Sequence, residues 1–318
     1  MTDEEKIKQS LLVAHLYYEE NMGQAAIAKK LNLSRPTISR LLRSARDSGL
    51  VKIQIFNPLL NADELSQQLS QKYGAKIMVV PSNFNGETLS INSVGAYTAD
   101  FLTKIVRPDD IIGIGWGKTI HSVTTRMENQ EVPGVQVVQL KGSVNFENER
   151  TYAYESINEL GRVYHTQPQY LPLPTIFDNQ VTKEMVEQDR FIKAVLDCGK
   201  KANIAIFSVG TVRKSALLFQ LGYFDEDQKE NLQDHAVGDI VSRFINKDGE
   251  LVDEKLNERT VGIQLSDLKE KRYSILVASG VAKLAGVNAV LTAGYANHAV
   301  IDLALAQALI DYEREQET

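Results

Sequence analysis

The stretch DIIGIGWGKT, residues 110–119, decides the fold. Its first half has the length and composition of a buried β-strand, and its second half is a glycine-rich turn in which Lys118 and Thr119 begin a helical segment. Glycines in such a turn let the backbone approach an anion closely, and free N–H groups at a helix start bind phosphate. The pattern is neither a Walker loop nor a complete GxGxxG motif. A purely structural turn is therefore the alternative.

The alternation of strand and helix extends in both directions along the chain. It predicts an α/β domain with a doubly wound, mostly parallel sheet, in which ligands bind beyond the carboxyl ends of the strands. The predicted strands are residues 76–80, 110–114, 135–140, 203–209, 273–278 and 299–301, and the predicted helices lie near residues 89–105, 118–127, 183–198 and 281–292.

Further candidates for binding a ligand follow other predicted strands. Residues 210–213 (GTVR) and 279–283 (SGVAK) are small-residue turns that end in a cation, and Lys141-Gly142 ends another strand. Each turn is a weak signal, but together they indicate one anionic ligand at one edge of the sheet. Two aspartates are candidates for bonding sugar hydroxyls, with loop capping as the alternative. The predicted ligand-binding residues are Gly115, Gly117, Lys118, Thr119, Lys141, Gly142, Asp178, Arg213, Asp239, Gly280 and Lys283.

A second, smaller unit precedes this domain. Residues 8–20 and 24–31 are predicted as two helices, and Ser34 is placed to cap a third helix with Pro36 in its first turn. Gly49 is placed to end that helix, and residues 51–55 alternate as in a strand that forms a wing. Asn57-Pro58 marks the boundary. We therefore expect a helix-turn-helix head, residues 1–57, and a ligand-binding and oligomerisation domain, residues 58–318.

The third helix of the head has a polar, basic face. Residues 1–56 hold nine lysines and arginines against six acidic residues, although the whole chain has a net charge of −6. Such a helix fits the DNA major groove, where arginine commonly reads guanine. The alternative is a solvated face on an ordinary three-helix cap. The predicted DNA-binding residues are Ser34, Arg35, Thr37, Ser39, Arg40, Arg43 and Arg46.

The composition of the 318 residues excludes several classes of protein. With 43% hydrophobic and 24% charged residues the chain is neither disordered nor collagen-like. The single cysteine, Cys198, cannot form an internal disulfide, and the five histidines show no metal-ligand spacing, so we expect no metal and no cofactor. No apolar run approaches the roughly 20 residues that cross a bilayer, and no secretory signal begins the chain. We expect a cytoplasmic protein without a membrane partner.

At the level of whole motifs the sequence resembles the SorC family of bacterial transcriptional regulators. The resemblance is carried by AAIAKKLNLSRPTISRLLRSARDSGL at residues 25–50, YLPLPTIFDN at 170–179, AVGDIVSRF at 236–244, and residues 113–119, 257–268 and 275–283. It implies a sugar-phosphate-binding domain of the sugar isomerase type, usually tetrameric, whose ligand modulates operator binding. The family's ligand positions correspond here to residues 115–119, Arg213 and Lys283. Ser279 departs from the family, which usually has glycine there.

VVQLKG at residues 137–142 and GYFDE at 222–226 are similar to the deoxyribonucleoside branch of that family. This similarity implies a repressor with deoxyribose 5-phosphate as its effector. Lys141 is then a candidate for a Schiff base with the sugar, because the 5-phosphate blocks the six-membered ring and the missing 2-hydroxyl leaves more open-chain aldehyde. Partial burial and the cations Lys118, Arg213 and Lys283 are expected to lower its pKa. A solvated or ion-paired lysine is the alternative.

Two functions of different classes fit these expectations. One is a ligand-released repressor, and the other is a sugar-phosphate isomerase-like enzyme with an accessory DNA-binding head. The body does not separate them, since fold does not determine function. The basic head favours the repressor, and no carboxylate–histidine pair accompanies the predicted phosphate loops. One helix-turn-helix unit buries too little surface for tight specific binding, so a dimer or tetramer on operator DNA is expected.

Overall fold

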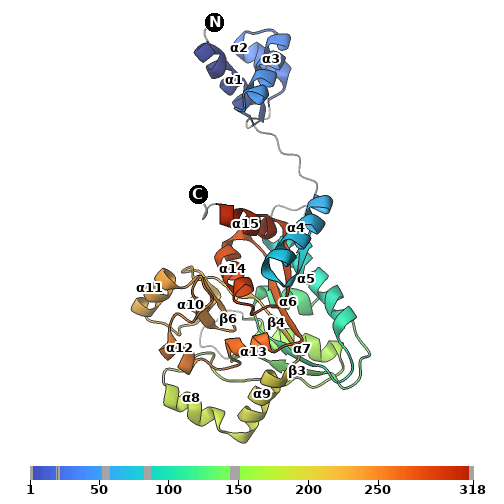
Figure 1. The fold of residues 1–318 in the computed structure, drawn as a ribbon, viewed down its shortest axis with the longest axis vertical. Helices are drawn as coiled ribbons and strands as arrows, with labels where there is room; N and C mark the ends of the chain where they lie inside the picture. The colour runs from blue at the N-terminus through green and yellow to red at the C-terminus, as the bar shows by residue number, and fades with distance from the viewer. Residues whose placement is uncertain are drawn as a thin grey trace. The chain divides into compact units, whose positions relative to one another are not determined.

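The computed structural model describes residues 3–18, 20, 22–51, 58–81, 87–143 and 151–314. The chain divides into two compact units, Met1–Asn57 and Pro58–Thr318 (Figure 1). The first unit is helical, and the second is built on two β-sheets. Over the described residues, the helices are too short or too polar to cross a membrane.

Three helices form the first unit: α1 (Asp3–Tyr18), α2 (Gln24–Leu31) and α3 (Arg35–Asp47). Apolar residues at every third or fourth position of α3 are buried against α1 and α2, which makes a small core of Val13, Leu16, Ile27, Ile38, Leu41 and Leu42. The Ser34 hydroxyl caps α3 by accepting the Thr37 N–H at 3.3 Å, and Gly49 follows the helix with φ +74°. Residues 52–55 of the predicted wing strand lie outside the described residues.

The main sheet of the second unit has six parallel strands in the order β1-β9-β8-β4-β2-β3. All six correspond to strands predicted from the sequence, and the expected α/β fold class is confirmed. The strands are β1 (Lys76–Val80), β2 (Ile111–Ile114), β3 (Gln136–Gln139), β4 (Ile204–Phe207), β8 (Tyr273–Ala278) and β9 (His298–Asp302).

Helices cover both faces of this sheet, because its strands are apolar on both sides. In β4, Ile204 and Ile206 belong to one core, and Ala205 and Phe207 to the other. The core of the isoleucines includes α5 (Glu87–Ile105), α6 (Lys118–Thr124) and α7 (Ala153–Val163). The opposite core includes α4 (Pro58–Tyr73), α14 (Leu284–Thr292) and α15 (Leu303–Arg314). The sheet is therefore doubly wound (Figure 1).

The strand order creates a crevice at one place. From β2 the chain continues to β3 on one side, and it returns to β4 on the other side of β2. In open parallel sheets, ligands bind outside the carboxyl ends of the strands at such a switch point. The loops after β2 and β4 therefore mark where a ligand would bind.

The segment of the chain that connects β4 to β8 forms a second, antiparallel sheet, which was not predicted. Its order is β5-β6-β7, with strands of only two or three residues: β5 (Val209–Gly210), β6 (Gly238–Ile240) and β7 (Arg243–Ile245). Around it lie α10 (Leu217–Gln220), α11 (Glu226–His235), α12 (Glu254–Arg259) and α13 (Leu265–Lys269). A separate apolar cluster that includes Phe219, Phe224 and Phe244 packs this part of the chain.

The single helix predicted near residues 183–198 is wrong. The structure has two helices, α8 (Gln180–Glu187) and α9 (Arg190–Lys201). Asp189 separates them, because its carboxylate accepts the N–H groups of Phe191 and Ile192 at 2.9 and 3.4 Å. An aspartate that caps a new helix in this way ends the preceding one.

Candidate functional site

A cleft of about 820 Å³ lies at the carboxyl ends of the parallel strands, and we call it the main cleft. Its walls are the segments that follow β2, β4, β8 and β9, together with Lys141 after β3 and Asp239 from the antiparallel sheet. Eight of the eleven predicted ligand-binding residues line it: Gly117, Lys118, Thr119, Lys141, Arg213, Asp239, Gly280 and Lys283. The cleft thus lies where the strand order places a ligand.

The segment after β2 supplies one wall. Gly117 has φ +125°, which only glycine adopts readily, and it begins α6. The first N–H groups of a helix have no acceptor within the helix, so α6 offers N–H donors beside the Lys118 ammonium. Gly115 does not line the cleft, because its N–H donates to the Ile206 carbonyl at 2.9 Å and so continues the sheet.

The segment after β8 supplies the facing wall. Gly280 has φ +92°, and its N–H donates to the Asp302 carboxylate at 2.8 Å. The same carboxylate oxygen accepts the Ser279 hydroxyl at 2.7 Å and the Ser90 hydroxyl at 2.5 Å. The Gly280 N–H is therefore committed to the protein itself, and the Ser279 hydroxyl holds the loop in place. Binding of an anion at this wall therefore depends on the residues that follow Gly280 in the chain, above all Lys283.

Lys283 joins the two walls. Its ammonium donates to the Ser208 hydroxyl at 2.9 Å and to the Thr119 hydroxyl at 3.4 Å. Arg213 is exposed at the rim of the cleft, after β5. Together with Lys118 these side chains place three positive charges on one ligand-sized space, which favours an anion with two negative charges.

Lys141 is the most unusual group in the main cleft. Its side chain is buried, with 6% exposed, and its ammonium donates to the Ser242 hydroxyl at 2.9 Å. On another side the ammonium lies 3.7 Å from the centre of the Trp116 ring. Burial lowers the pKa of Lys141 to about 8, and the charge of Asp239 acts in the opposite direction. Burial was one of the two expected causes of the lowered pKa, whereas the other expected cause, the cations Lys118, Arg213 and Lys283, does not contribute.

Asp239, for which loop capping was the alternative to binding a sugar hydroxyl, lies on strand β6 and not in a loop. Its carboxylate accepts the Ser242 N–H at 3.2 Å and packs against Gly210, where an added Cβ would lie only 1.9 Å from the carboxylate. Burial raises the pKa of Asp239, and the charges of Lys141 and Lys283 and the Ser242 N–H lower it in part. The Asp239 carboxylate and the Lys141 ammonium therefore both bond to Ser242, the first to its N–H and the second to its hydroxyl, and no sequence pattern singled out this residue.

Two other predicted residues lie outside the main cleft. Asp178 is exposed just before α8, next to the helix cap Asn179. Gly142 is buried under Pro174, and its carbonyl accepts the Trp116 indole N–H at 2.9 Å. Gly142 therefore supports the cleft by fixing Trp116, which lines it. The position of Trp116 between the glycines of residues 113–119 was the one signal that could have identified it.

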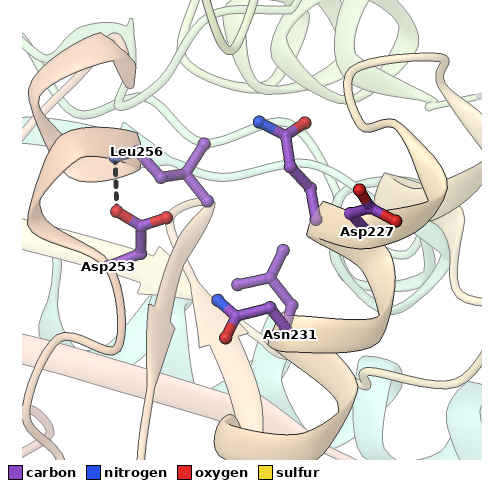
Figure 2. Close-up of a pocket in the computed structure, with 6 residues that line it drawn as sticks. Asp227, Asn231, Asp253 and Leu256 are labelled. Carbon is purple, nitrogen blue, oxygen red and sulfur yellow. Dashed lines mark hydrogen bonds between the residues drawn. The ribbon is translucent and has the colours of Figure 1, made fainter.

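A smaller depression, of about 200 Å³, lies between α11 and α12 (Figure 2). Asp227, Asn231 and Asp253 line it, and the Asp253 carboxylate is engaged in accepting the Leu256 N–H at 3.0 Å. Its acidic lining disfavours an anion. Across the part of the chain that the structure describes, no cluster of three or more histidines, cysteines or carboxylates could hold a metal ion.

In the first unit, α3 presents a basic surface. The side chains of Arg35, Ser39, Arg40, Arg43 and Arg46 are exposed, whereas Thr37 is half-buried and its hydroxyl lies 2.8 Å from that of Ser34. Within the described residues, none of these four arginines takes part in an ion pair. Ser34 and Thr37 thus organise the start of α3, and the arginines present their charges to solvent.

Comparison with known proteins matches almost the whole chain. A family model for a sugar-binding domain matches residues 57–311. The deoxyribonucleoside regulator of Bacillus subtilis (strain 168) is 42% identical over 313 residues, which are 97% of this chain and 99% of that protein. The sorbitol operon regulator of Klebsiella pneumoniae is 30% identical over 316 residues, 98% of this chain and 100% of that protein.

The structural comparison agrees with the sequence comparison. The crystal structure of the full-length sorbitol operon regulator SorC from Klebsiella pneumoniae has a TM-score of 0.73 and 28% identity, and covers 98% of this chain and 99% of that one. The match therefore includes the helical unit as well as the sugar-binding domain. Both relatives carry the name of a regulator, and the transcriptional regulator LsrR of Enterobacter sp. (strain 638) is 26% identical over 98% of this chain and 94% of that protein. The chain belongs to the SorC family of transcriptional regulators.

Proposed function

We propose that the chain is a transcriptional repressor that leaves its operator when the main cleft binds a sugar phosphate, and that deoxyribose 5-phosphate is this effector. The observation that carries the proposal is a buried lysine amine in the same cleft as three cations. An open-chain sugar phosphate offers an aldehyde to the amine and an anion to the cations. The name of the 42%-identical relative, a deoxyribonucleoside regulator, supports a deoxyribose as the sugar.

The phosphate is assigned to the walls after β2 and β8. Lys283, from the wall after β8, already donates to the Thr119 hydroxyl on the wall after β2 and to the Ser208 hydroxyl after β4, so a phosphate there would contact both walls. Lys118 and Arg213 add positive charge, and the start of α6 adds N–H donors. A phosphate dianion would offset the repulsion among the three cations, which is a physical reason for the effector to carry a phosphate.

The aldehyde is assigned to Lys141. Imine formation requires the neutral amine, and burial lowers the pKa of Lys141 to about 8, so that part of the population is neutral near pH 7. The lysine ammonium and the aldehyde together give a protonated imine and one water molecule, with no net gain or loss of protons. Because the imine keeps the positive charge, Asp239 in the cleft wall stabilises it as it stabilises the ammonium.

Operator DNA is assigned to α3. Four exposed arginines on one short helix suit the major groove and its phosphates. Tight specific binding needs two or more such helices, so the active form is a dimer or tetramer on repeated half-sites. A protein with this role acts in the cytoplasm, where bacterial DNA lies.

Borohydride trapping tests the effector chemistry. Purified protein is incubated with deoxyribose 5-phosphate, reduced, digested and mapped by mass spectrometry. We expect an adduct on the peptide that contains Lys141, and none with Lys141→Ala. Binding of the sugar without any adduct would reduce Lys141 to a structural cation. Turnover of pentose phosphates would instead support the isomerase-like enzyme.

A further inference from the structure

The turn that meets Lys141 has an unusual backbone. Val241 and Ser242 form a two-residue connection between β6 and β7, and their φ angles are +46° and +66°. Hairpin turns with two positive φ angles normally use Asn-Gly, Asp-Gly or Gly-Gly. A valine and a serine at these positions cost free energy, since side chains with a Cβ disfavour positive φ. Such strain is kept only where the surrounding structure enforces it, and it is most common at functional sites.

The surrounding structure does enforce this turn. The Asp239 carboxylate accepts the Ser242 N–H at 3.2 Å. Next along β7, the buried Arg243 guanidinium donates to the carbonyls of Ile263 and Gly262 at 2.7 and 3.1 Å. The turn is therefore fixed on both sides, independently of Lys141.

The turn places one hydroxyl, that of Ser242, beside the Lys141 amine. Ser242 has no exposed surface, and its Oγ lies 2.9 Å from the Lys141 Nζ. Among the described residues, this hydroxyl is the only hydrogen-bond acceptor of that ammonium. The Trp116 ring limits the amine from another side, at 3.7 Å. Glycine would form the turn without strain, so the serine is explained by its hydroxyl.

We propose that Ser242 is a positioning residue, which holds the Lys141 amine in the direction from which it attacks the sugar aldehyde. This inference rests on the imine chemistry proposed above. In the step itself, the Lys141 nitrogen gives up two of its three ammonium protons and its lone pair forms the bond to C1, while the bond from C1 to the carbonyl oxygen breaks and that oxygen leaves as water with those two protons. Ser242 forms no bond to the sugar. Its part is to restrict the rotation of a long, flexible side chain before the attack.

The variant Ser242→Gly separates positioning from folding, because glycine accepts φ +66° and the turn is retained. The rate of borohydride-trapped adduct formation is measured against the concentration of deoxyribose 5-phosphate. We expect the rate constant at saturating sugar, measured at pH 9 where the amine is mostly neutral, to fall about 10- to 100-fold, because a misplaced reacting group costs about this much. The half-saturating concentration should stay within about twofold, because the phosphate contacts are unchanged. Ser242→Ala, which keeps the Cβ, should show the same loss.

Ser208→Ala is the matched control, since the Ser208 hydroxyl accepts a hydrogen bond from a second lysine in the wall of the main cleft, Lys283, at 2.9 Å. Ser208→Ala should raise the half-saturating concentration of deoxyribose 5-phosphate and leave the rate constant at saturation unchanged. Loss of the Ser242 hydroxyl also removes an acceptor that favours the ammonium, so the midpoint of the pH–rate curve should move to lower pH. A residue that only shaped the turn would change neither this midpoint nor the rate constant at saturation.

Two results would overturn the inference in distinguishable ways. If the wild-type protein forms an adduct and both Ser242 variants form it at the same rate and with the same pH midpoint, Ser242 does not position the amine. If the wild-type protein forms no adduct at all, the imine chemistry itself is refuted, and the role of Ser242 with it.

Discussion

The pH dependence of adduct formation follows from the burial of Lys141. An amine with a pKa of about 8 is neutral in about one molecule of eleven at pH 7, whereas an ordinary lysine with a pKa of 10.5 is neutral in about one of 3,000. Lys141 should therefore react about 300-fold faster at pH 7 than an exposed lysine of equal nucleophilicity. The rate should rise about tenfold per pH unit up to pH 7.5 and level off above pH 8.5.

The assay is the rate of borohydride-trapped adduct at saturating deoxyribose 5-phosphate, measured between pH 6 and pH 10. Saturating sugar is essential, because the second ionisation of the phosphate, near pH 6, changes its affinity for the cleft. A rate that continues to rise tenfold per unit to pH 10 would refute the reasoning. It would mean that Lys141 titrates as an exposed lysine and that burial in the main cleft does not prepare it for reaction.

Three further predictions concern separate parts of the chain. Gly210→Ala should destabilise the protein by roughly 1–3 kcal/mol in urea denaturation, because the new methyl group would strike Asp239; Gly199→Ala, whose nearest neighbour would lie at 3.5 Å, should be near neutral. Arg43→Ala should weaken binding about equally on all DNA sequences and lower the slope of log K against log salt by about one, measured by fluorescence anisotropy. The unfolded chain keeps the Lys141 proton up to pH 10.5, whereas the folded protein loses it near pH 8. Between these two pH values the free energy of unfolding should therefore rise with pH, by up to about 1.4 kcal/mol per pH unit more in wild type than in Lys141→Met, measured by urea denaturation.

The parallel sheet could be predicted from the sequence, because its strands are buried on both faces. β8 has five buried residues among six, and a continuous apolar run of this length between turn residues indicates such a strand. The glycines at 117 and 280 were also informative, since a positive φ at the end of a strand calls for glycine. These two signals place both walls of the main cleft without any knowledge of contacts between distant residues.

The contacts that prepare Lys141 could not be predicted. Ser242 is 101 positions away in the chain, and the hairpin that presents it is made of strands three residues long, too short for an alternating pattern. Its turn also lacks the glycine or asparagine by which such hairpins are recognised. Ser242, which accepts the hydrogen bond of Lys141, therefore occupies a turn position that normally requires glycine or asparagine.

The most direct test of the account is the affinity of the protein for its operator with and without deoxyribose 5-phosphate. A duplex selected by the protein from a random pool serves as operator, and binding is followed by fluorescence anisotropy at fixed salt. The effector acts only through unequal affinity for the two states, so DNA must weaken sugar-phosphate binding by the same factor. We predict that saturating deoxyribose 5-phosphate weakens operator binding by about tenfold or more. Unchanged or tighter binding would contradict the account.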